Sequence, residues 1–454
     1  MTKWQPVAIA LGILVTSGAF SAAPSSAPTN SRPPTTQPPR DPTAVESFNS
    51  LQNELHQART QNDWSGYLTA AKRQTEFLNG SPLSRLEVAR AEAHLGDLST
   101  ASSELLAFVQ MGQSSELLET LPDLAPLRAT PSFAAIRHQN FANLEPVARS
   151  TLAFRLKDRN LLPEDIDFDR NRRRFFLSSV LERKIVTVTL NGELADFSSP
   201  PDNWPVFALR IDEAHQLLWV SEAAVEGFGG IAPSDQGRSA LLCYDLSSGK
   251  LLQRIEGPRP SALGDMTLSV DGAVIVSDGE HGGIYRAHRG DDHMERIDLG
   301  DFISPQTPAI TADGLRVFVP DYVRGVALMT LKTKQVVWLP TQGRFALNGV
   351  DGLYRIRDRL IAVQNGTSPE RVVIFTMDPG QKTIVAADLI ERSTNTLGDP
   401  THGVVVDNTF YYIANSGWNV LDDHGKVKPG LALSEPLVMK VELDTKPRRS
   451  SSSR

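Results

Sequence analysis

Hydrophobic and polar positions follow two different periods along this chain, and the period changes near Phe133. Between Ala44 and Gln113 apolar residues recur every three or four positions, which is the spacing of amphipathic helices. Turns that contain glycine, at Gly80–Pro82 and Gly96–Asp97, interrupt this spacing. The apolar stripes are Leu51, Leu55 and Ala58, then Tyr67, Ala70, Ala71 and Phe77, then Leu86, Val88, Ala91 and Leu95. The pattern predicts short helices over residues 43–140 that pack as hairpins.

From Phe133 to Leu443 the chain consists of short β-rich runs separated by Gly, Asp, Asn and Pro. Six segments repeat one order, a polar turn followed by an aliphatic or aromatic strand that ends in small polar residues. They begin at Asp169, Asp212, Asp271, Asp313, Arg357 and Asp407. A further strand follows each of them, with first residues Ile185, Leu241, Gly283, Val326, Val372 and Leu437, at intervals of 56, 42, 43, 46 and 65 residues. Repeats of this length predict a six-bladed β-propeller over residues 150–445.

Outer strands complete four-stranded blades for the first five repeats, and the sixth lacks its own. The outer strands are Glu193–Phe197, Leu251–Ile255, Glu295–Leu299, Val336–Leu339 and Thr383–Leu389. The run Thr151–Leu156 has no other partner, so we predict that it pairs with Leu437–Leu443 and closes the ring. Closure removes exposed sheet edges. A β-sandwich is the alternative, but it would not repeat one strand order six times.

The helical part has a resemblance of its own. The segment Ala89 to Leu106, ARAEAHLGDLSTASSELL, resembles a degenerate tetratricopeptide repeat in its order of helix, Gly-Asp turn and helix. A helical bundle without repeats fits the same spacing. Either arrangement favours contact with a protein partner, or simple packing, over catalysis.

The two ends of the chain carry segments of other kinds. Lys3, the apolar run Val7–Phe20 and the small residues Ser21–Ala23 follow the order of a secretory signal peptide, which we place at residues 1–23. We therefore expect a periplasmic or secreted protein without an integral membrane domain after cleavage. An uncleaved anchor is the alternative, although the run is shorter than the ~20 residues of a spanning helix. Residues 24–42, rich in Pro, Ser and Thr, predict an extended linker, and residues 446–454 a disordered tail.

Charge and cysteine content narrow the classes of partner. The net charge of -7 gives no electrostatic reason to expect nucleic acid, which requires clustered Lys and Arg. Cys243 is the single cysteine, so no intramolecular disulfide forms, and its apolar neighbours indicate a small core residue. We expect a small-molecule or protein partner.

Candidate chemistry follows from the propeller geometry, because residues that open the innermost strands converge at one mouth of the channel. The openings are Pro163-Glu164-Asp165, Trp204-Pro205-Val206, Gly264-Asp265-Met266, Gln306-Thr307-Pro308, Val350-Asp351-Gly352 and Thr401-His402-Gly403. Glu164, Asp265 and Asp351 around one narrow mouth would repel one another, and a hard divalent cation such as Ca²⁺ relieves this repulsion. The alternative is that these groups cap strand ends and hold waters. His402 is a candidate ligand or general base, or a structural donor.

Three segments resemble blades of the gluconolactonase/regucalcin family (SMP-30/LRE-like): Leu162–Val188, Thr307–Val326 and Gly349–Gly366. The resemblance implies a six-bladed propeller with a divalent metal, here Ca²⁺, Zn²⁺ or Mn²⁺, at the channel mouth. It implies metal ligation by Glu164 in blade one and by Asp351, which opens blade five. The family's Asn that opens blade four is replaced by Gln306-Thr307, where Gln306 or Thr307 still offers an oxygen ligand. The family's Asn-Asp pair for substrate stands here as Gly264-Asp265.

Two classes of function follow. In the first, the metal polarises a lactone or similar ester carbonyl, Asp351 or Asp265 accepts the proton of the attacking water, and Asp265 and His402 contact the substrate. In the second, the propeller is not an enzyme and binds a protein or small ligand, as the fold alone permits. The sequence Asn365-Gly366-Thr367 is interpreted as a blade turn rather than as a used glycosylation site.

Overall fold

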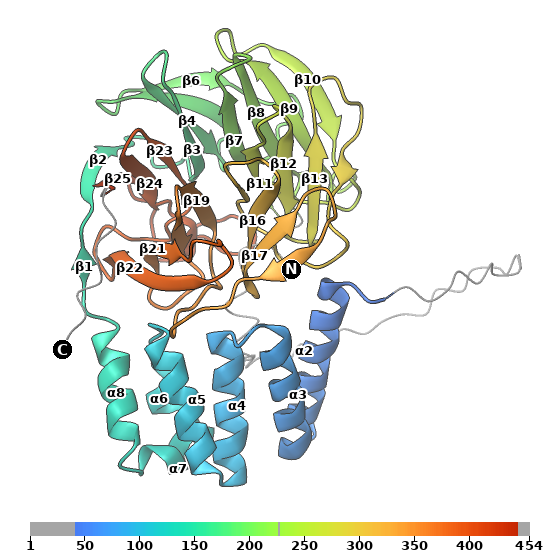
Figure 1. Ribbon diagram of the computed structural model, residues 1–454. Helices are drawn as coiled ribbons and strands as arrows, with labels where there is room; N and C mark the ends of the chain where they lie inside the picture. The colour runs from blue at the N-terminus through green and yellow to red at the C-terminus, as the bar shows by residue number, and fades with distance from the viewer. Residues whose placement is uncertain (1–40, 226–227, 444–454) are drawn as a thin grey trace, which may run out of the picture.

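The computed structural model describes residues 41–225 and 228–443, in which a helical segment precedes a six-bladed β-propeller (Figure 1). The predicted fold class is therefore confirmed. The predicted signal peptide and tail lie outside the described residues, as does the linker up to residue 40. Within the described part of the chain, no helix combines the length and apolar character needed to cross a membrane.

The helical segment runs to Ala142, slightly beyond the predicted residue 140. Its helices are α2 (Ala44–Thr60), α3 (Trp64–Phe77), α4 (Pro82–Leu95), α5 (Leu98–Gln110), α6 (Leu117–Thr120), α7 (Ala125–Arg128) and α8 (Phe133–Ala142), with the 3-10 turn η1 (Pro122–Leu124). Thr43 and Glu46 form a capping box at the start of α2, and Gly96 ends α4 in the left-handed conformation. Consecutive helices from α2 to α5 pack against each other. The resemblance to tetratricopeptide repeats stays a prediction.

Each blade follows the predicted strand order from the channel outward. Blade one contains β3 (Pro163–Asp169), β4 (Arg174–Ser179), β5 (Lys184–Thr189) and β6 (Leu194–Ser198), and blade two β7 (Val206–Asp212), β8 (Leu217–Ala223), β9 (Ser239–Asp245) and β10 (Leu251–Glu256). Blade three contains β11 (Leu263–Leu268), β12 (Val274–Asp278), β13 (Gly283–Ala287) and β14 (Glu295–Arg296), and blade four β15 (Ala309–Ile310), β16 (Arg316–Asp321), β17 (Gly325–Thr330) and β18 (Val336–Trp338). Blade five contains β19 (Gly352–Ile356), β20 (Arg359–Gln364), β21 (Arg371–Met377) and β22 (Ile384–Arg392).

The sixth blade closes the ring as predicted. It contains β23 (Gly403–Val406), β24 (Thr409–Asn415) and β25 (Leu437–Glu442), and its outer strand is β2 (Thr151–Arg155) from the start of the propeller. Thr151 pairs with Lys440 and Arg155 with Leu437, in antiparallel register. The ends of the propeller are therefore joined by backbone hydrogen bonds within one blade.

Two outer strands differ from the prediction. In blade three, β14 covers only Glu295–Arg296, because the carboxylate of Asp298 accepts the backbone N–H of Ile284 at 2.8 Å and so replaces a strand partner. Blade five carries an additional strand, β1 (Val147–Ala148), which pairs with β22. The strand β1 therefore begins before residue 150, where the propeller was predicted to start.

The propeller has no single core, because an apolar cluster fills each interface between neighbouring blades. The large buried side chains in these clusters include Phe175, Phe176, Trp219, Phe302, Phe318, Phe375 and Phe410. Cys243 lies in one of them, in agreement with its interpretation as a core residue. Because adjacent blades are packed along their length, the openings of the inner strands are held at fixed positions around the mouth.

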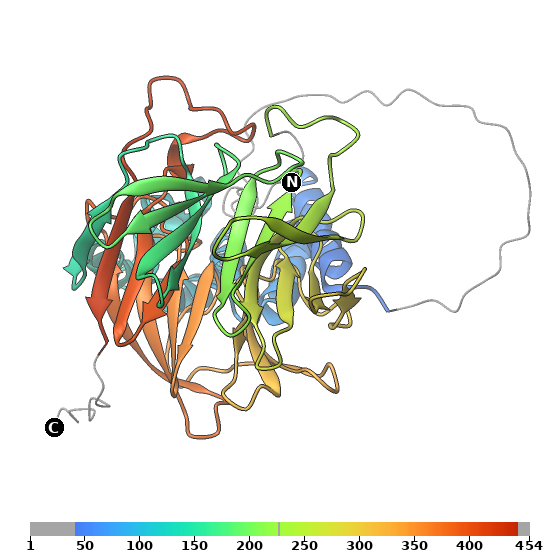
Figure 2. The ribbon, with the colours of Figure 1, turned by 90° about the horizontal axis from the view of Figure 1, so that it is seen from above.

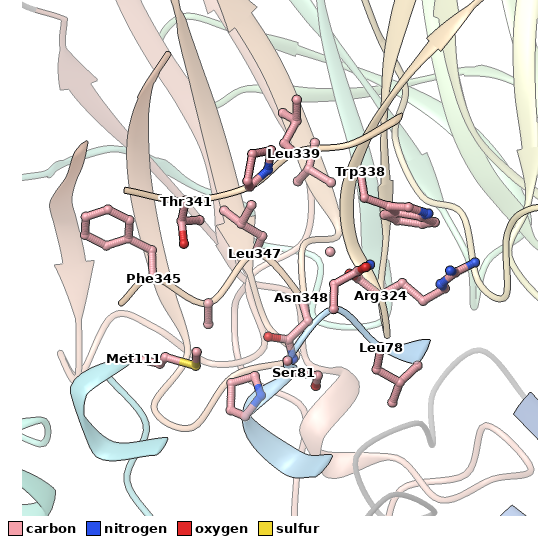
Figure 3. A pocket seen from close by; sticks show the side chains of 17 residues that line it. Leu78, Ser81, Met111, Arg324, Trp338, Leu339, Thr341, Phe345, Leu347 and Asn348 are labelled. Carbon is pink, nitrogen blue, oxygen red and sulfur yellow. The ribbon is translucent and has the colours of Figure 1, made fainter. Parts of the chain in front are cut away.

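The helical segment lies along one side of the propeller, against the region from the end of blade three to blade five (Figures 1 and 2). Ala44 donates its backbone N–H to Gly300 at 2.8 Å, and the Arg392 guanidinium reaches the carbonyl of Glu145 at 2.8 Å. Between the turn that joins α3 to α4 and blade four lies a cavity of about 270 Å³ (Figure 3). The chain therefore folds with its two parts in contact beside the blades that carry Thr307 and Asp351.

Candidate metal centre at the propeller mouth

The structure brings together the ionisable residues that open the inner strands of blades one, three, five and six. Glu164, Asp265, Asp351 and His402 are each at most 2% exposed. Ligand atoms of Glu164, Asp351 and His402 all lie within 4.8 Å of one another. They converge because the inner strands β3, β11, β19 and β23 all begin at the same mouth of the channel.

Thr307 opens blade four next to this group. Its backbone N–H donates to the carbonyl of Asp351 at 3.2 Å, and its side chain is buried. Among the described residues its Oγ1 has no hydrogen-bond partner. A buried hydroxyl in this state requires a water or another ligand.

His402 is the cation of the mouth. Its Nδ1 lies 2.7 Å from the carbonyl oxygen of Glu164, and its Nε2 lies 2.9 Å from Oδ1 of Asp265. Burial alone would lower the pKa of His402, but the carboxylates of Asp265 and Asp351 outweigh burial and raise this pKa to about 10. Both ring nitrogens therefore carry protons at neutral pH. To bind a cation through Nε2, His402 would have to lose that proton and release Asp265.

Trp418 covers Glu164, and the sequence reasoning missed it. Its indole N–H donates to Oε2 of Glu164 at 2.6 Å from the short turn η2 (Trp418–Val420). This turn lies in the long insertion between β24 and β25, which accounts for the longest predicted interval, 65 residues. That interval was the available signal. The insertion meets a second loop from blade two, where Gly229 donates its N–H to His424 at 3.3 Å and the Phe228 and Trp418 rings lie 6.4 Å apart.

Asn365 and Tyr322 hold Asp351, and they were missed as well. Asn365 donates from Nδ2 to Oδ2 of Asp351 at 2.9 Å, and the Tyr322 hydroxyl donates to Oδ1 of Asn365 at 3.0 Å. Both residues directly follow the second strand of their blade, β20 or β16. Because the second strand runs antiparallel to the first, its end lies at the same mouth. Applying this rule to the sequence would have found both residues.

Two further carboxyl groups extend the acidic mouth. The backbone N–H of Asp399 donates to Oε2 of Glu370 at 3.0 Å. Burial raises the pKa of Asp399 well above its ordinary value, and the charges of Glu370, Asp351 and Glu164 raise it further. Burial likewise raises the pKa of Glu370 to about 7. Asp399 therefore lies within electrostatic range of the Glu164 and Asp351 carboxylates, and Glu370 lies beside Asp399.

Asp165 lies next to Glu164 but has a different environment. Its carboxylate forms an ion pair with Arg210 and accepts the backbone N–H of Leu209 at 2.9 Å. Its charge is therefore balanced by blade two. Asp165 bonds two blades together, although its charge also contributes to the raised pKa of His402.

The residues at the mouth fit a divalent cation. Two carboxylates and a hydroxyl supply oxygen ligands of the kind that Ca²⁺ and Mn²⁺ prefer, and Zn²⁺ also accepts carboxylate oxygens. The buried Oγ1 of Thr307, which lacks a partner in the described chain, supports this fit. A cation would also relieve the repulsion among the acids.

Comparison with known proteins gives structural similarities only. No family model matches the chain, and no curated protein matches it. Among solved structures, a luciferin-regenerating enzyme is 13% identical, with 66% of this chain and 95% of that chain covered and a TM-score of 0.46. A gluconolactonase from Xanthomonas campestris is 14% identical, with 66% and 99% covered and a TM-score of 0.43. A virginiamycin B lyase from Staphylococcus aureus is 12% identical, with 64% and 98% covered and a TM-score of 0.43. The fold assignment rests on the strand pairing itself.

Proposed function

We propose that the chain is a hydrolase of a lactone or a similar small ester that uses a divalent cation at the propeller mouth. One observation carries the proposal: the buried carboxylates of Glu164 and Asp351 converge from blades one and five, with their oxygen atoms within 4.8 Å of each other and of the His402 ring. The resemblance of three blade segments to the gluconolactonase/regucalcin family supports the same reaction class. The candidate cations are Ca²⁺, Zn²⁺ and Mn²⁺.

Glu164, Asp351 and Thr307 would hold the cation through oxygen atoms. When bound, the cation would polarise the ester carbonyl and stabilise the negative charge that develops on its oxygen. Trp418 and Asn365 each donate to one oxygen of Glu164 and Asp351, at 2.6 and 2.9 Å, and so fix the orientation of these two carboxylates.

Asp351 and Asp265 are the proposed acceptors for the proton of the attacking water. Asp265 and His402 are the proposed contacts to the substrate. His402 lies 2.9 Å from Asp265 and keeps its proton at neutral pH, so it acts as a hydrogen-bond donor and a positive charge rather than as a base. The loop that carries Trp418 covers Glu164 and would limit the access of bulk water to the mouth.

The test is hydrolysis of a panel of lactones by chelator-treated chain that is reloaded with Ca²⁺, Zn²⁺ or Mn²⁺ in turn. We expect activity that depends on the cation, and we expect Glu164→Ala and Asp351→Ala to lose both activity and bound cation. Asp167→Asn is the matched control, because Asp167 is a carboxylate of the same inner strand β3 that accepts the backbone N–H of Ile211 at 2.8 Å. A chain that stays metal-free in excess of all three cations would contradict the proposal.

A second candidate function is a non-catalytic propeller that binds a small ligand or a protein. It is favoured by the donors that Glu164 and Asp351 already have, since carboxylates bonded to an indole N–H and an amide can be stable without a cation. For this candidate we expect no hydrolysis with any cation. The same lactone panel therefore separates the two functions.

We also propose that the protein acts in the periplasm or outside the cell, on a small-molecule substrate, with the helical segment available to a protein partner. The support for export is the order of Lys3, the apolar run Val7–Phe20 and the small residues Ser21–Ala23. Sequencing the N-terminus of the protein recovered from a producing cell checks this. We expect a start near residue 24, and retention of the intact signal in the cytoplasm would contradict it.

A further inference from the structure

Two loops support Asp351 from the side on which the helical segment lies. One loop follows β16 in blade four and carries Tyr322, and the other follows β20 in blade five and carries Asn365. The Tyr322 hydroxyl donates to Asn365, and Asn365 donates to Asp351, over 3.0 and 2.9 Å. Tyr322 is therefore connected to Asp351, the proposed metal ligand, through the side-chain amide of Asn365.

The helical segment holds the first of these loops. Val323 packs with Leu78 and Phe48 in one apolar cluster. Arg324 donates from Nε to the carbonyl of Phe77 at 3.2 Å, and its own carbonyl accepts Nδ2 of Asn79 at 3.0 Å. Its guanidinium lies 4.4 Å from the Phe77 ring and 4.3 Å from the Trp338 ring, and Figure 3 shows Arg324, Trp338 and Leu78 together at the junction. Both residues that follow Tyr322 are thus fixed by helices.

The helical segment also holds the second loop. Ser114 donates its backbone N–H to the carbonyl of Ser368 at 2.6 Å, and Ser368 donates back to Oε1 of Gln113 at 3.3 Å. Arg371 joins the loop to the helices, because it donates to Oε1 of Gln364 at 2.7 Å and to the carbonyl of Met111 at 3.3 Å. These contacts lie on both sides of Asn365 in the sequence.

The tyrosine ring has little freedom between the two loops. A Cβ built at Gly366 would lie 2.5 Å from Tyr322 Cζ, so the ring contacts the backbone beside Asn365 directly. The small cavity behind the ring is lined on the helical side by Phe48, Leu78, Leu83 and Ser84. The position of the hydroxyl is therefore set jointly by the helices and by blade five.

We propose that the helical segment is a positioning element of the metal centre and that Tyr322 is the positioning residue through which it acts. The inference rests on the proposed function, because it assumes that Asp351 binds a cation. Removing a partner that orients a ligating carboxylate lowers metal affinity about 10- to 100-fold. Without the tyrosine O–H, the amide of Asn365 is held less firmly, and its bond to Asp351 orients that carboxylate less precisely.

The first test compares Tyr322→Phe with Tyr412→Phe in the full chain, titrated with Mn²⁺ alone by calorimetry after chelation. Tyr412 is the matched control, because its hydroxyl bonds to the hydroxyl of Ser150 at 2.9 Å in blade six and touches no residue of the mouth cluster. We expect Tyr322→Phe to weaken Mn²⁺ binding about 10- to 100-fold and Tyr412→Phe to leave it unchanged. We expect Asn365→Ala to weaken binding similarly and to add little in the double variant with Tyr322→Phe, since the two act in series.

The second test addresses the helices themselves. Leu78→Ala removes the side chain that packs on Val323, and we expect roughly 2- to 30-fold weaker Mn²⁺ binding. Leu105→Ala is the control, because Leu105 is buried in the core of the helical segment and lies in a different apolar cluster. It should lower thermal stability without changing metal affinity.

The outcomes separate the two proposals. If the parent chain binds Mn²⁺ and both Tyr322→Phe and Leu78→Ala bind it equally well, the positioning role is wrong and the proposed function stands. If the parent chain binds none of Mn²⁺, Zn²⁺ and Ca²⁺, the proposed function fails and the positioning role fails with it. Equal losses of Mn²⁺ affinity in Leu78→Ala and Leu105→Ala would also overturn the positioning role, because they would reflect lost stability alone.

Discussion

The helical segment and the propeller mouth each bury a cluster of charged groups, but the excess of acids over cations is larger at the mouth. In the helical segment Arg90 forms ion pairs with Glu87 at 2.8 Å and with Asp123 at 2.9 Å. Tyr67 donates its hydroxyl to Glu87. Burial raises the pKa of Glu87, while Arg90 acts in the opposite direction and stabilises its charge. In this cluster one guanidinium bonds to both carboxylates, which is the arrangement of a structural ion network.

At the mouth the acids outnumber the cations. Glu164, Asp265 and Asp351 lie around one imidazolium, His402, and the charges of Glu164 and Asp351 help to raise the pKa of a further buried acid, Asp399. Lys428 is a cation that favours the charged form of Asp399, yet burial and the acids still raise the pKa of that group. A buried excess of one sign is destabilising unless a ligand compensates it. The difference fits the proposal that the mouth cluster binds a cation, whereas the helical cluster stabilises the fold.

The largest expected effects come from breaking balanced pairs. Arg90→Met leaves Glu87 and Asp123 without their cation, and we expect it to lower the free energy of unfolding by about 3–5 kcal/mol. At the propeller, Asp165→Asn should act in the same direction, because it leaves Arg210 without its carboxylate. Denaturant unfolding of each variant measures both effects. If Arg90→Met cost less than about 1 kcal/mol, the helical cluster would not be a structural network.

A smaller change in the free energy of unfolding, of opposite sign, is expected for a substitution at Glu164. Glu164→Gln keeps an acceptor for the Trp418 indole but removes one charge from the excess, so we expect the chelated protein to gain roughly 0.5–2 kcal/mol. The same variant should lose the stabilisation that a bound cation gives the parent chain. Thermal unfolding with and without Mn²⁺ measures both. A chelated variant less stable than the parent would argue that the mouth is already balanced.

The pH dependence of stability should differ between the clusters as well. The folded chain keeps a proton on Glu370 up to about pH 7, whereas the unfolded chain releases it near the ordinary value of 4.5. Between these values the folded state binds more protons, so the stability of the chelated protein should fall as pH rises. Asp399 acts in the same direction. We expect Glu370→Gln to flatten this fall, and an unchanged slope across pH 4.5–7 would contradict the raised pKa.

The smallest effect is expected at an exposed ion pair of the helical segment. Arg73 and Glu54 form a pair in which the two side chains are 57% and 38% exposed. Water and salt screen such a pair, so Arg73→Met should change the free energy of unfolding by less than about 1 kcal/mol. A loss as large as that of Arg90→Met would mean that burial does not distinguish the two pairs.

Most of the fold could be predicted from the sequence, because each blade repeats a local pattern of turn and strand. The closure of the ring by Thr151–Leu156 could also be predicted, since this strand had no other partner and closed propellers leave no free edge. The short β14 could not, because it depends on the side chain of Asp298 bonding to a neighbouring strand. The strand β1 could not either, since two residues carry no detectable period.

The candidate site, too, could be predicted only in part from the sequence. Glu164, Asp265, Asp351 and His402 could be placed together from the sequence, because each opens an inner strand and the blade geometry carries it to one mouth. Trp418 lies 254 positions from Glu164 and comes from an insertion without a repeat, so no local pattern links the two. The raised pKa of His402 could not be predicted either, because it depends on the distances to Asp265 and Asp351 that only the folded chain defines.

The most direct test of the unbalanced mouth is the number of divalent cations that the chain binds. Chelator-treated protein is dialysed to equilibrium against Mn²⁺, Zn²⁺ and Ca²⁺ in turn, and the bound metal is measured by elemental analysis. We expect one tightly held cation for each parent chain and none for Glu164→Gln or Asp351→Asn. A parent chain without bound metal, or variants that bind as much as the parent, would contradict the account.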